Sequence, residues 1–173
     1  MTLFPALAAN VPGGGAQTLG WISAASGFGA LAGALYLARR KSAPVLGWTL
    51  GISSVVFSCG LMLLAQATRL HGMLCFAFVS AFGMMLFMAC GNTIIQTVVE
   101  DDKRGRVMSF FTFSLLGLSP FGGLLMGAAA QRFGIKLDLF FQGILCLLGS
   151  FWFLRKAGHV NAHISGKLNS VSG

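Results

Sequence analysis

The chain has 173 residues, of which 55% are hydrophobic and 9% are charged, and its formal net charge is +8 at pH 7. A soluble domain averages about 25% charged residues, so this composition excludes an ordinary soluble domain. The chain has no basic soluble segment to accompany its net charge, which argues against a nucleic-acid-binding protein.

Five long apolar runs follow one another along the chain. A bilayer core of about 30 Å requires about 20 apolar residues of helix. Lipid offers the backbone no hydrogen-bond partners, so runs of this length should be helical. The sequence predicts an all-α integral membrane protein with about five transmembrane helices in a lipid bilayer. The predicted spans are Thr18–Ala38, Ala43–Ala67, Gly72–Val99, Val107–Ala130 and Ile135–Leu154.

Three regions follow from these spans. Residues 1–17 are predicted to be an external segment, in which Leu3–Ala9 is too short to span a bilayer but has the composition of a helix end. We therefore expect part of a preceding helix to lie upstream. Residues 18–156 are the five-helix bundle, and the polar residues 157–173 are predicted to form a flexible cytoplasmic tail.

Lys and Arg are distributed unevenly between the ends of the spans. Nine of the twelve follow the first, third and fifth spans, and three follow the second and fourth. An excess of these residues marks the cytoplasmic side. The N-terminus is therefore predicted to be outside and the C-terminus cytoplasmic, with the charged segment Glu100–Arg106 as a cytoplasmic loop.

Two segments and the spacing between them resemble a known family. Gly27–Ser42 and Gly91–Gly134 resemble the C-terminal half of a major facilitator superfamily transporter, in particular the branch of enterobactin-type siderophore exporters and macrolide efflux pumps. The most specific part is Asn92–Ser109, with an Asn-Thr pair, Gln96, the acids Glu100–Asp102, and then Arg-Gly-Arg-Val-Met-Ser. The resemblance covers roughly residues 3–156.

This resemblance implies a fold of twelve helices in two halves, with the five spans as helices eight to twelve. It implies a transporter in the bacterial plasma (inner) membrane that exports a siderophore or an amphiphilic drug-like compound by alternating access. The expected partners are a small-molecule substrate and a missing N-terminal half, in the same or a separate chain. The substrate site of such proteins lies at the midplane between the halves.

Two other classes of protein compete with a transporter. If the other half is absent, the chain would be a truncated, non-transporting membrane fragment or a half-module that needs a partner chain. An enzyme is disfavoured, because the acid cluster Glu100–Asp102 has no His nearby. No cofactor or metal site is predicted, since the four Cys lie inside spans without metal-ligand spacing.

The third span carries a stripe of candidate substrate residues. Residues at steps of three and four share a helix face, and here they include Met85, Met88, Asn92 and Gln96. Amides inside a membrane are costly unless they face a partner or a wet cavity, and Met adapts to varied ligands. The stripe is therefore either a cavity wall for a bulky apolar substrate or a helix-packing face, and taken alone it favours packing.

Glycine pairs and a proline give structural predictions. Gly29 with Gly33 and Gly123 with Gly127 have the four-residue spacing that lets membrane helices approach closely. Pro120 is predicted to kink the fourth span, because it removes a backbone donor.

The charged residues between spans allow two interpretations. The resemblance implies a cytoplasmic latch, in which charged loops form ion pairs that hold the cytoplasmic face closed. The other interpretation is that these charges only set the topology and are solvated. The candidate latch residues are Arg39, Arg40, Lys41, Asp101, Asp102, Arg104 and Arg106.

Overall fold

The computed structural model describes residues 16–39, 46–99 and 101–171, and all regular structure in these ranges is helical. Five stretches are long and apolar enough to cross a membrane, with α5 and α6 together forming one of them. The predicted all-α fold with five spans is confirmed. The helices are α2 (Ala16–Arg39), α3 (Leu46–Gln66), α4 (Leu70–Val98), α5 (Asp101–Gly117), α6 (Ser119–Phe133) and α7 (Ile135–Val171).

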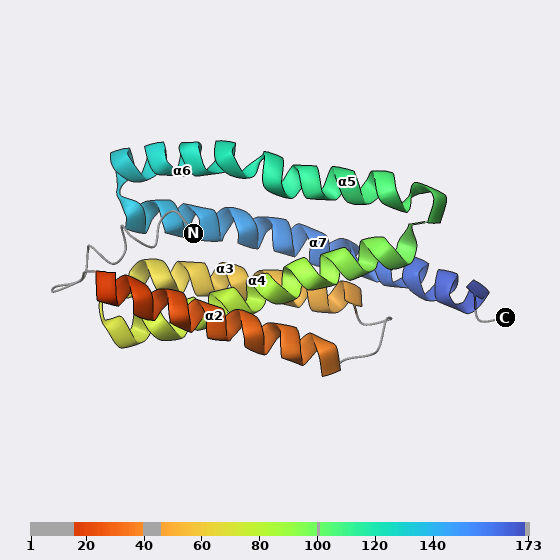
Figure 1. Ribbon diagram of the computed structural model, residues 1–173, viewed down its shortest axis with the longest axis horizontal. Helices are drawn as coiled ribbons and strands as arrows, with labels where there is room; N and C mark the ends of the chain where they lie inside the picture. The colour runs from red at the N-terminus through yellow and green to blue at the C-terminus, as the bar shows by residue number, and fades with distance from the viewer. Residues whose placement is uncertain (1–15, 40–45, 100, 172–173) are drawn as a thin grey trace.

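The spans run alternately in opposite directions (Figure 1). Helix α4 packs against both α2 and α3, and α3 packs against α7, which makes a four-helix bundle. The α5–α6 pair lies along α7 on the other side from α2 and is held more loosely (Figure 1). The end of α2, the start of α5 and the later part of α7 therefore lie at one end of the molecule.

Glycines set the close approach of α2 and α4. A Cβ added at Gly29 would meet the carbonyl oxygen of Phe78, and one at Gly33 would lie 3.0 Å from the carbonyl oxygen of Phe82. Lipid tails are as apolar as the helices, so association in a bilayer depends on such tight packing. The structure thus places the first predicted glycine pair at a helix–helix contact.

The α3–α4 contact is equally close. A Cβ added at Gly83 would lie 2.6 Å from the backbone nitrogen of Phe57, and one at Gly60 would lie 2.9 Å from the Cα of Ser80. Neither glycine belongs to a pair with four-residue spacing that the sequence analysis identified. Each meets the backbone of the other helix, so neither tolerates a side chain without a shift of the helices.

The buried apolar cluster lies at the end of the bundle where α2, α4 and α7 begin and α3 ends. Its neighbour Asp138, in the first turn of α7, is also buried and accepts a hydrogen bond of 2.8 Å from Gln142 Nε2. An acid in the first turn is favourable, because the helix dipole is positive there. The buried members of the cluster are Ile22, Leu64, Ala65, Ala67, Met73, Ala77 and Leu139.

The fourth span is interrupted near its middle. Helix α5 ends at Gly117 and α6 begins at Ser119, with Pro120 in the first turn of α6. Proline is well tolerated in a first turn, because its missing N–H would have no partner in the helix there. The interruption therefore precedes Pro120 by two residues, at Leu118, whose carbonyl oxygen accepts from the Gly122 N–H at 2.9 Å.

The charged segment Glu100–Arg106 was expected to be a loop, and this expectation is wrong for most of it. Helix α5 begins at Asp101, so the charges from Asp101 to Arg106 occupy its first turns. Acidic side chains stabilise a helix start through the helix dipole, and Lys and Arg are good helix formers. An apolar run therefore locates the part of a helix that can lie in lipid, but it does not show at which residue outside the lipid the helix begins.

The two ends of the chain extend past the predicted bundle. Residues 1–15 of the predicted external segment lie outside the described residues, and α2 begins at Ala16. Helix α7 continues beyond the predicted span to Val171. The backbone of residues 157–171 is therefore helical, while the expected flexibility of this tail stays a prediction.

Candidate functional site

The two amides of the α4 stripe are paired with each other. Gln96 Nε2 donates a hydrogen bond of 3.1 Å to Asn92 Oδ1, one helical turn away. Gln96 is exposed and Asn92 is partly exposed. This hydrogen bond lies within α4, so it leaves the pair on an accessible part of the helix near the charged end and does not tie α4 to a neighbouring helix.

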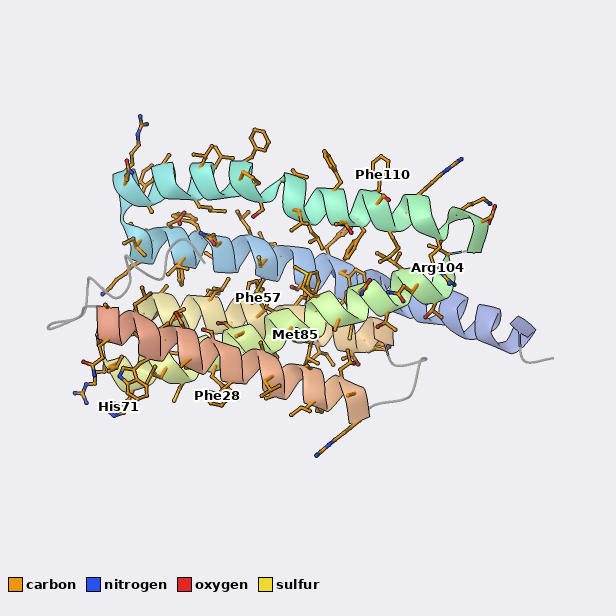
Figure 2. All side chains as sticks on the ribbon, viewed as in Figure 1. Phe28, Phe57, His71, Met85, Arg104 and Phe110 are labelled. Carbon is orange, nitrogen blue, oxygen red and sulfur yellow. The ribbon has the colours of Figure 1, made fainter. Side chains whose placement is uncertain are left out.

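The two methionines of the stripe face different neighbours. Met85 packs toward α2, since a Cβ at Gly33 would lie 3.3 Å from the Met85 Cβ. Met88 instead lines a cavity between α3, α4 and α7. Figure 2 shows Met85 on α4 and Phe57 on α3 in the central part of the bundle. The structure therefore does not bring Met85, Met88, Asn92 and Gln96 together as one wall.

The cavity has a volume of about 490 Å³. Drug-sized ligands occupy pockets of roughly 300–1,000 Å³. The cavity was missed by the sequence analysis apart from Met88, although its lining has the three- and four-residue spacing of a helix face. Helices α3 and α4 contribute Leu50, Ser54, Phe57, Met84, Phe87 and Met88.

Helix α7 closes the third side of the cavity with Cys146, Gly149, Ser150, Trp152 and Phe153. The two serine hydroxyls in this lining donate their protons within their own helices and not into the cavity. The Ser54 hydroxyl donates to the Gly51 carbonyl at 2.8 Å, and the Ser150 hydroxyl donates to the Cys146 carbonyl at 2.7 Å. Both serines thus use their proton on their own helix.

The charged candidates gather at one end of the molecule (Figure 1). Arg39 lies in the last turn of α2, and Asp102, Arg104 and Arg106 lie in the first turns of α5. All four side chains are exposed, and Figure 2 shows Arg104 at this end. Arg155 on α7 lies over the Phe151 ring, 4.6 Å from its centroid.

Three of the candidate latch residues cannot be placed in this way. Arg40 and Lys41 lie outside the described residues, as does the side chain of Asp101. The latch itself stays a prediction. Among the side chains that the structure describes, no three His, Cys, Asp or Glu are grouped in a way that could hold a metal ion.

A model of the Major Facilitator Superfamily matches residues 1–169 of the chain. The chain belongs to this superfamily. No curated protein and no solved structure matches it. Members of this superfamily are membrane transporters for small molecules and are not enzymes. This agrees with the five apolar spans of the chain and with the prediction that it is not an enzyme.

The α5–α6 arm of this major facilitator protein is left uncovered by the residues that the structure describes. None of the described side chains of α5 and α6 is buried. Gly123 and Gly127 lie on α6, and a Cβ added to either would meet no atom within 4 Å. Among the described residues, the second predicted glycine pair therefore has open space where a side chain would extend. The arm also exposes large apolar side chains, among them Phe110, Phe113, Leu116, Phe121, Leu124 and Leu125.

Proposed function

We propose that this chain is the C-terminal part of a major facilitator exporter. Its five spans would be helices eight to twelve of a twelve-helix protein in the bacterial plasma (inner) membrane. The N-terminal end lies outside and the C-terminal end in the cytoplasm. The exported compound is a siderophore or an amphiphilic drug-like molecule, and transport proceeds by alternating access between two helix bundles.

The open glycines of α6 are the observation that carries the proposal of a second bundle. Small residues in membrane helices are enriched where another helix approaches closely. Gly29 and Gly33 follow this rule inside the chain, whereas Gly123 and Gly127 have open space where a neighbour would be. A missing N-terminal half that packs on α6 accounts for this difference.

The substrate class follows from the chemistry of the spans and from the resemblance of Asn92–Ser109 to siderophore and macrolide exporters. The first four predicted spans contain no Asp, Glu, Lys or Arg. A fixed charge inside a span would mark a site for an ion or a strongly polar ligand. The adaptable Met side chains and the accessible Asn92–Gln96 pair instead suit a bulky amphiphile.

The charged end supplies the elements of a gate. Arg39, Asp102, Arg104 and Arg106 are exposed at the end proposed to be cytoplasmic. Each exposed ion pair is worth only about 0–1 kcal/mol, so a closed state needs several of them at once. Ion pairs between these residues and the missing half would close the cytoplasmic face and would break when it opens.

The second candidate is a membrane fragment that does not transport. A chain without the other bundle has at most half of a substrate site at the midplane. The first experiment is therefore an immunoblot of native membranes with an antibody against residues 157–173. We expect a band about twice the 18.2 kDa of this chain. A band at the mass of this chain alone contradicts a single double-length exporter and supports the fragment, and transport would then require a separate partner chain.

Efflux is tested after the length is known. Deletion of the whole gene should raise the cellular accumulation of an amphiphilic dye or lower the siderophore released to the medium, and the intact gene should restore either effect. A double-length protein whose deletion changes neither quantity overturns the proposed substrate class but leaves the two-bundle architecture standing.

A further inference from the structure

The closest contacts between helices show which residues lie at the same height along the bundle. Where the Cβ position of a glycine meets a neighbouring helix, the two residues are level, and each further residue advances a helix axis by 1.5 Å. Helices α2 and α4 run in parallel, and α3 runs opposite to both α4 and α7 (Figure 1). The level pairs are Gly29 with Phe78, Gly33 with Phe82, Gly60 with Ser80, Gly91 with Leu50, Gly143 with Met62 and Gly51 with Leu154.

Basic and aromatic side chains form a first ring at the end of the bundle where α4 begins. Arg69 directly precedes α4, and the level pairs place Trp21 of α2 and Lys136 of α7 at its height. Arg132 lies in the last turn of α6, which leads into α7. All four side chains are exposed. Side chains of these types anchor helices where the hydrocarbon of a bilayer meets its headgroups.

A second ring lies at the other end of the bundle. Arg39 ends α2, Trp48 lies in the first turn of α3, and Arg155 of α7 is level with them. All three side chains are exposed. On α4 their height corresponds to residues 88–92, about twenty residues from the first ring. At 1.5 Å per residue the two rings are about 30 Å apart, which matches the hydrocarbon thickness of a typical bilayer.

The belt of side chains between the two rings suits hydrocarbon. In the described residues of α2, α3, α4 and α7, the belt contains a single Asp, Glu, Lys or Arg, and this residue, Asp138, is buried. The exposed side chains include Phe28 at 67% and Leu31 at 55% of full accessibility. A charge on a lipid-facing surface is costly, and the described part of the belt avoids this cost.

The end of α4 and the start of α5 extend beyond the second ring. Figure 1 shows them past the ends of α2 and α3. Helix α4 continues to Val98, about 9 Å beyond Asn92 along its axis. The exposed side chains of α4 change from apolar to polar at the height of the second ring. They are Cys75, Phe78, Val79, Met84 and Phe87 before it, and Thr93 and Gln96 after it.

We propose that bilayer hydrocarbon covers the bundle only between the two rings, and that the end of α4 and the start of α5 stand in water. Hydropathy predicts the whole of Gly72–Val99 as a span, whereas the rings restrict its hydrocarbon-covered part to about twenty residues. The Asn92–Gln96 pair then lies at the aqueous surface and not at the midplane, where transporters hold their substrates. This placement uses contacts inside the chain and does not depend on the proposed transport function.

The tryptophans test the position of the rings. The full chain with Trp21→Phe and Trp152→Phe, in phosphatidylcholine vesicles, keeps Trp48 as its one fluorophore of this type. We expect a nitroxide near the headgroup end of the acyl chains to quench Trp48 about twofold more than one near the methyl end, because Trp prefers the interface. The control is Leu31→Trp in a chain with Phe at all three native positions. It lies midway between the rings and should give the reverse order. The opposite order for either tryptophan overturns the proposal.

A second measurement tests the end of α4. In a chain whose four cysteines are replaced by alanine, Gln96→Cys and Thr93→Cys are compared with Leu31→Cys, using a membrane-impermeant maleimide on both sides of the vesicles. The thiolate is the reactive form and hydrocarbon disfavours a charge, so we expect the two α4 thiols to react at least about tenfold faster. If they react as slowly as Leu31→Cys, the amide pair lies in hydrocarbon. If Leu31→Cys reacts as fast as they do, lipid does not cover the belt. Either result overturns the proposal.

Discussion

The four-helix bundle and the α5–α6 arm have similar apolar composition but opposite packing. In α2, α3, α4 and α7 between 22% and 33% of the most apolar window is buried, whereas in the arm, residues 102–133, none is. A Cβ added at Gly29, Gly60 or Gly83 of the bundle would meet the backbone of a neighbouring helix, whereas one added at Gly123 or Gly127 of the arm would meet no atom within 4 Å. Hydropathy alone therefore does not distinguish a helix face that packs on protein from one that lies open.

The largest expected effect lies at the α3–α4 contact. Gly83→Val places a side chain against the Phe57 backbone nitrogen, 2.6 Å from the position of the new Cβ. Because the backbone cannot move aside as a side chain can, we expect a loss of about 3 kcal/mol in stability, at the upper end of overpacking effects. The midpoint of thermal unfolding in detergent measures it.

The matched control for this substitution is Gly127→Val in the arm, which should leave the midpoint unchanged. If the two variants unfold at the same temperature, the arm is packed as tightly as the bundle, and the comparison between the two regions fails.

The buried carboxylate of the bundle gives the next effect. Gln142→Leu removes the donor to Asp138 Oδ2 and should destabilise the chain by about 1.5 kcal/mol, because a buried acceptor loses its hydrogen bond. Gln131→Leu changes the same residue type on the exposed face of α6 and should have no effect. Equal unfolding midpoints for the two variants would mean that water replaces Gln142 at Asp138.

A third prediction sharpens the interpretation of the arm. Gly127→Val should change the stability of this chain by less than about 0.5 kcal/mol, as surface substitutions usually do. In a double-length protein the same change should cost about 1–3 kcal/mol, because the added side chain would overpack the proposed contact. The midpoint of thermal unfolding, measured for both forms with and without the substitution, tests this prediction. If the midpoint of the double-length protein does not change, the main support for a second bundle on α6 is lost.

The smallest effect is expected at the interruption of the fourth span. Pro120 lies in the first turn of α6, where no intrahelical hydrogen bond is lost, so Pro120→Ala should shift stability by less than about 0.5 kcal/mol. Ala81→Pro in the interior of α4 should instead cost about 3 kcal/mol or more. A large destabilisation by Pro120→Ala would show that the proline itself holds α5 and α6 in place.

The spans could be predicted from the sequence because lipid imposes a minimum length and apolar content on each helix. A close helix contact could be predicted where two glycines lie four residues apart, as with Gly29 and Gly33. Gly60 and Gly83 were missed because neither has a second glycine four residues away, and a single sequence does not show which helices touch.

The α4 stripe was only partly informative for the same reason. Helix α4 has α2, α3, α5 and α7 as neighbours, so positions three or four residues apart can face different helices. Met85 packs toward α2, while Met84 and Phe87, which the sequence analysis did not single out, line the cavity with Met88. Periodicity defines a face of a helix but not what covers it.

The serines of the bundle have a mechanical consequence. At the contacts of α3 with α4 and α7, the hydroxyls of Ser53, Ser58 and Ser80 donate to the carbonyls of Leu50, Ser54 and Ala77 on their own helices. These protons therefore do not cross-link one helix to the next. A shift of one helix along its neighbour would therefore break none of these three hydrogen bonds. At these positions the steric fit of the two helices resists such a shift, and no hydrogen bond donated by these serines does.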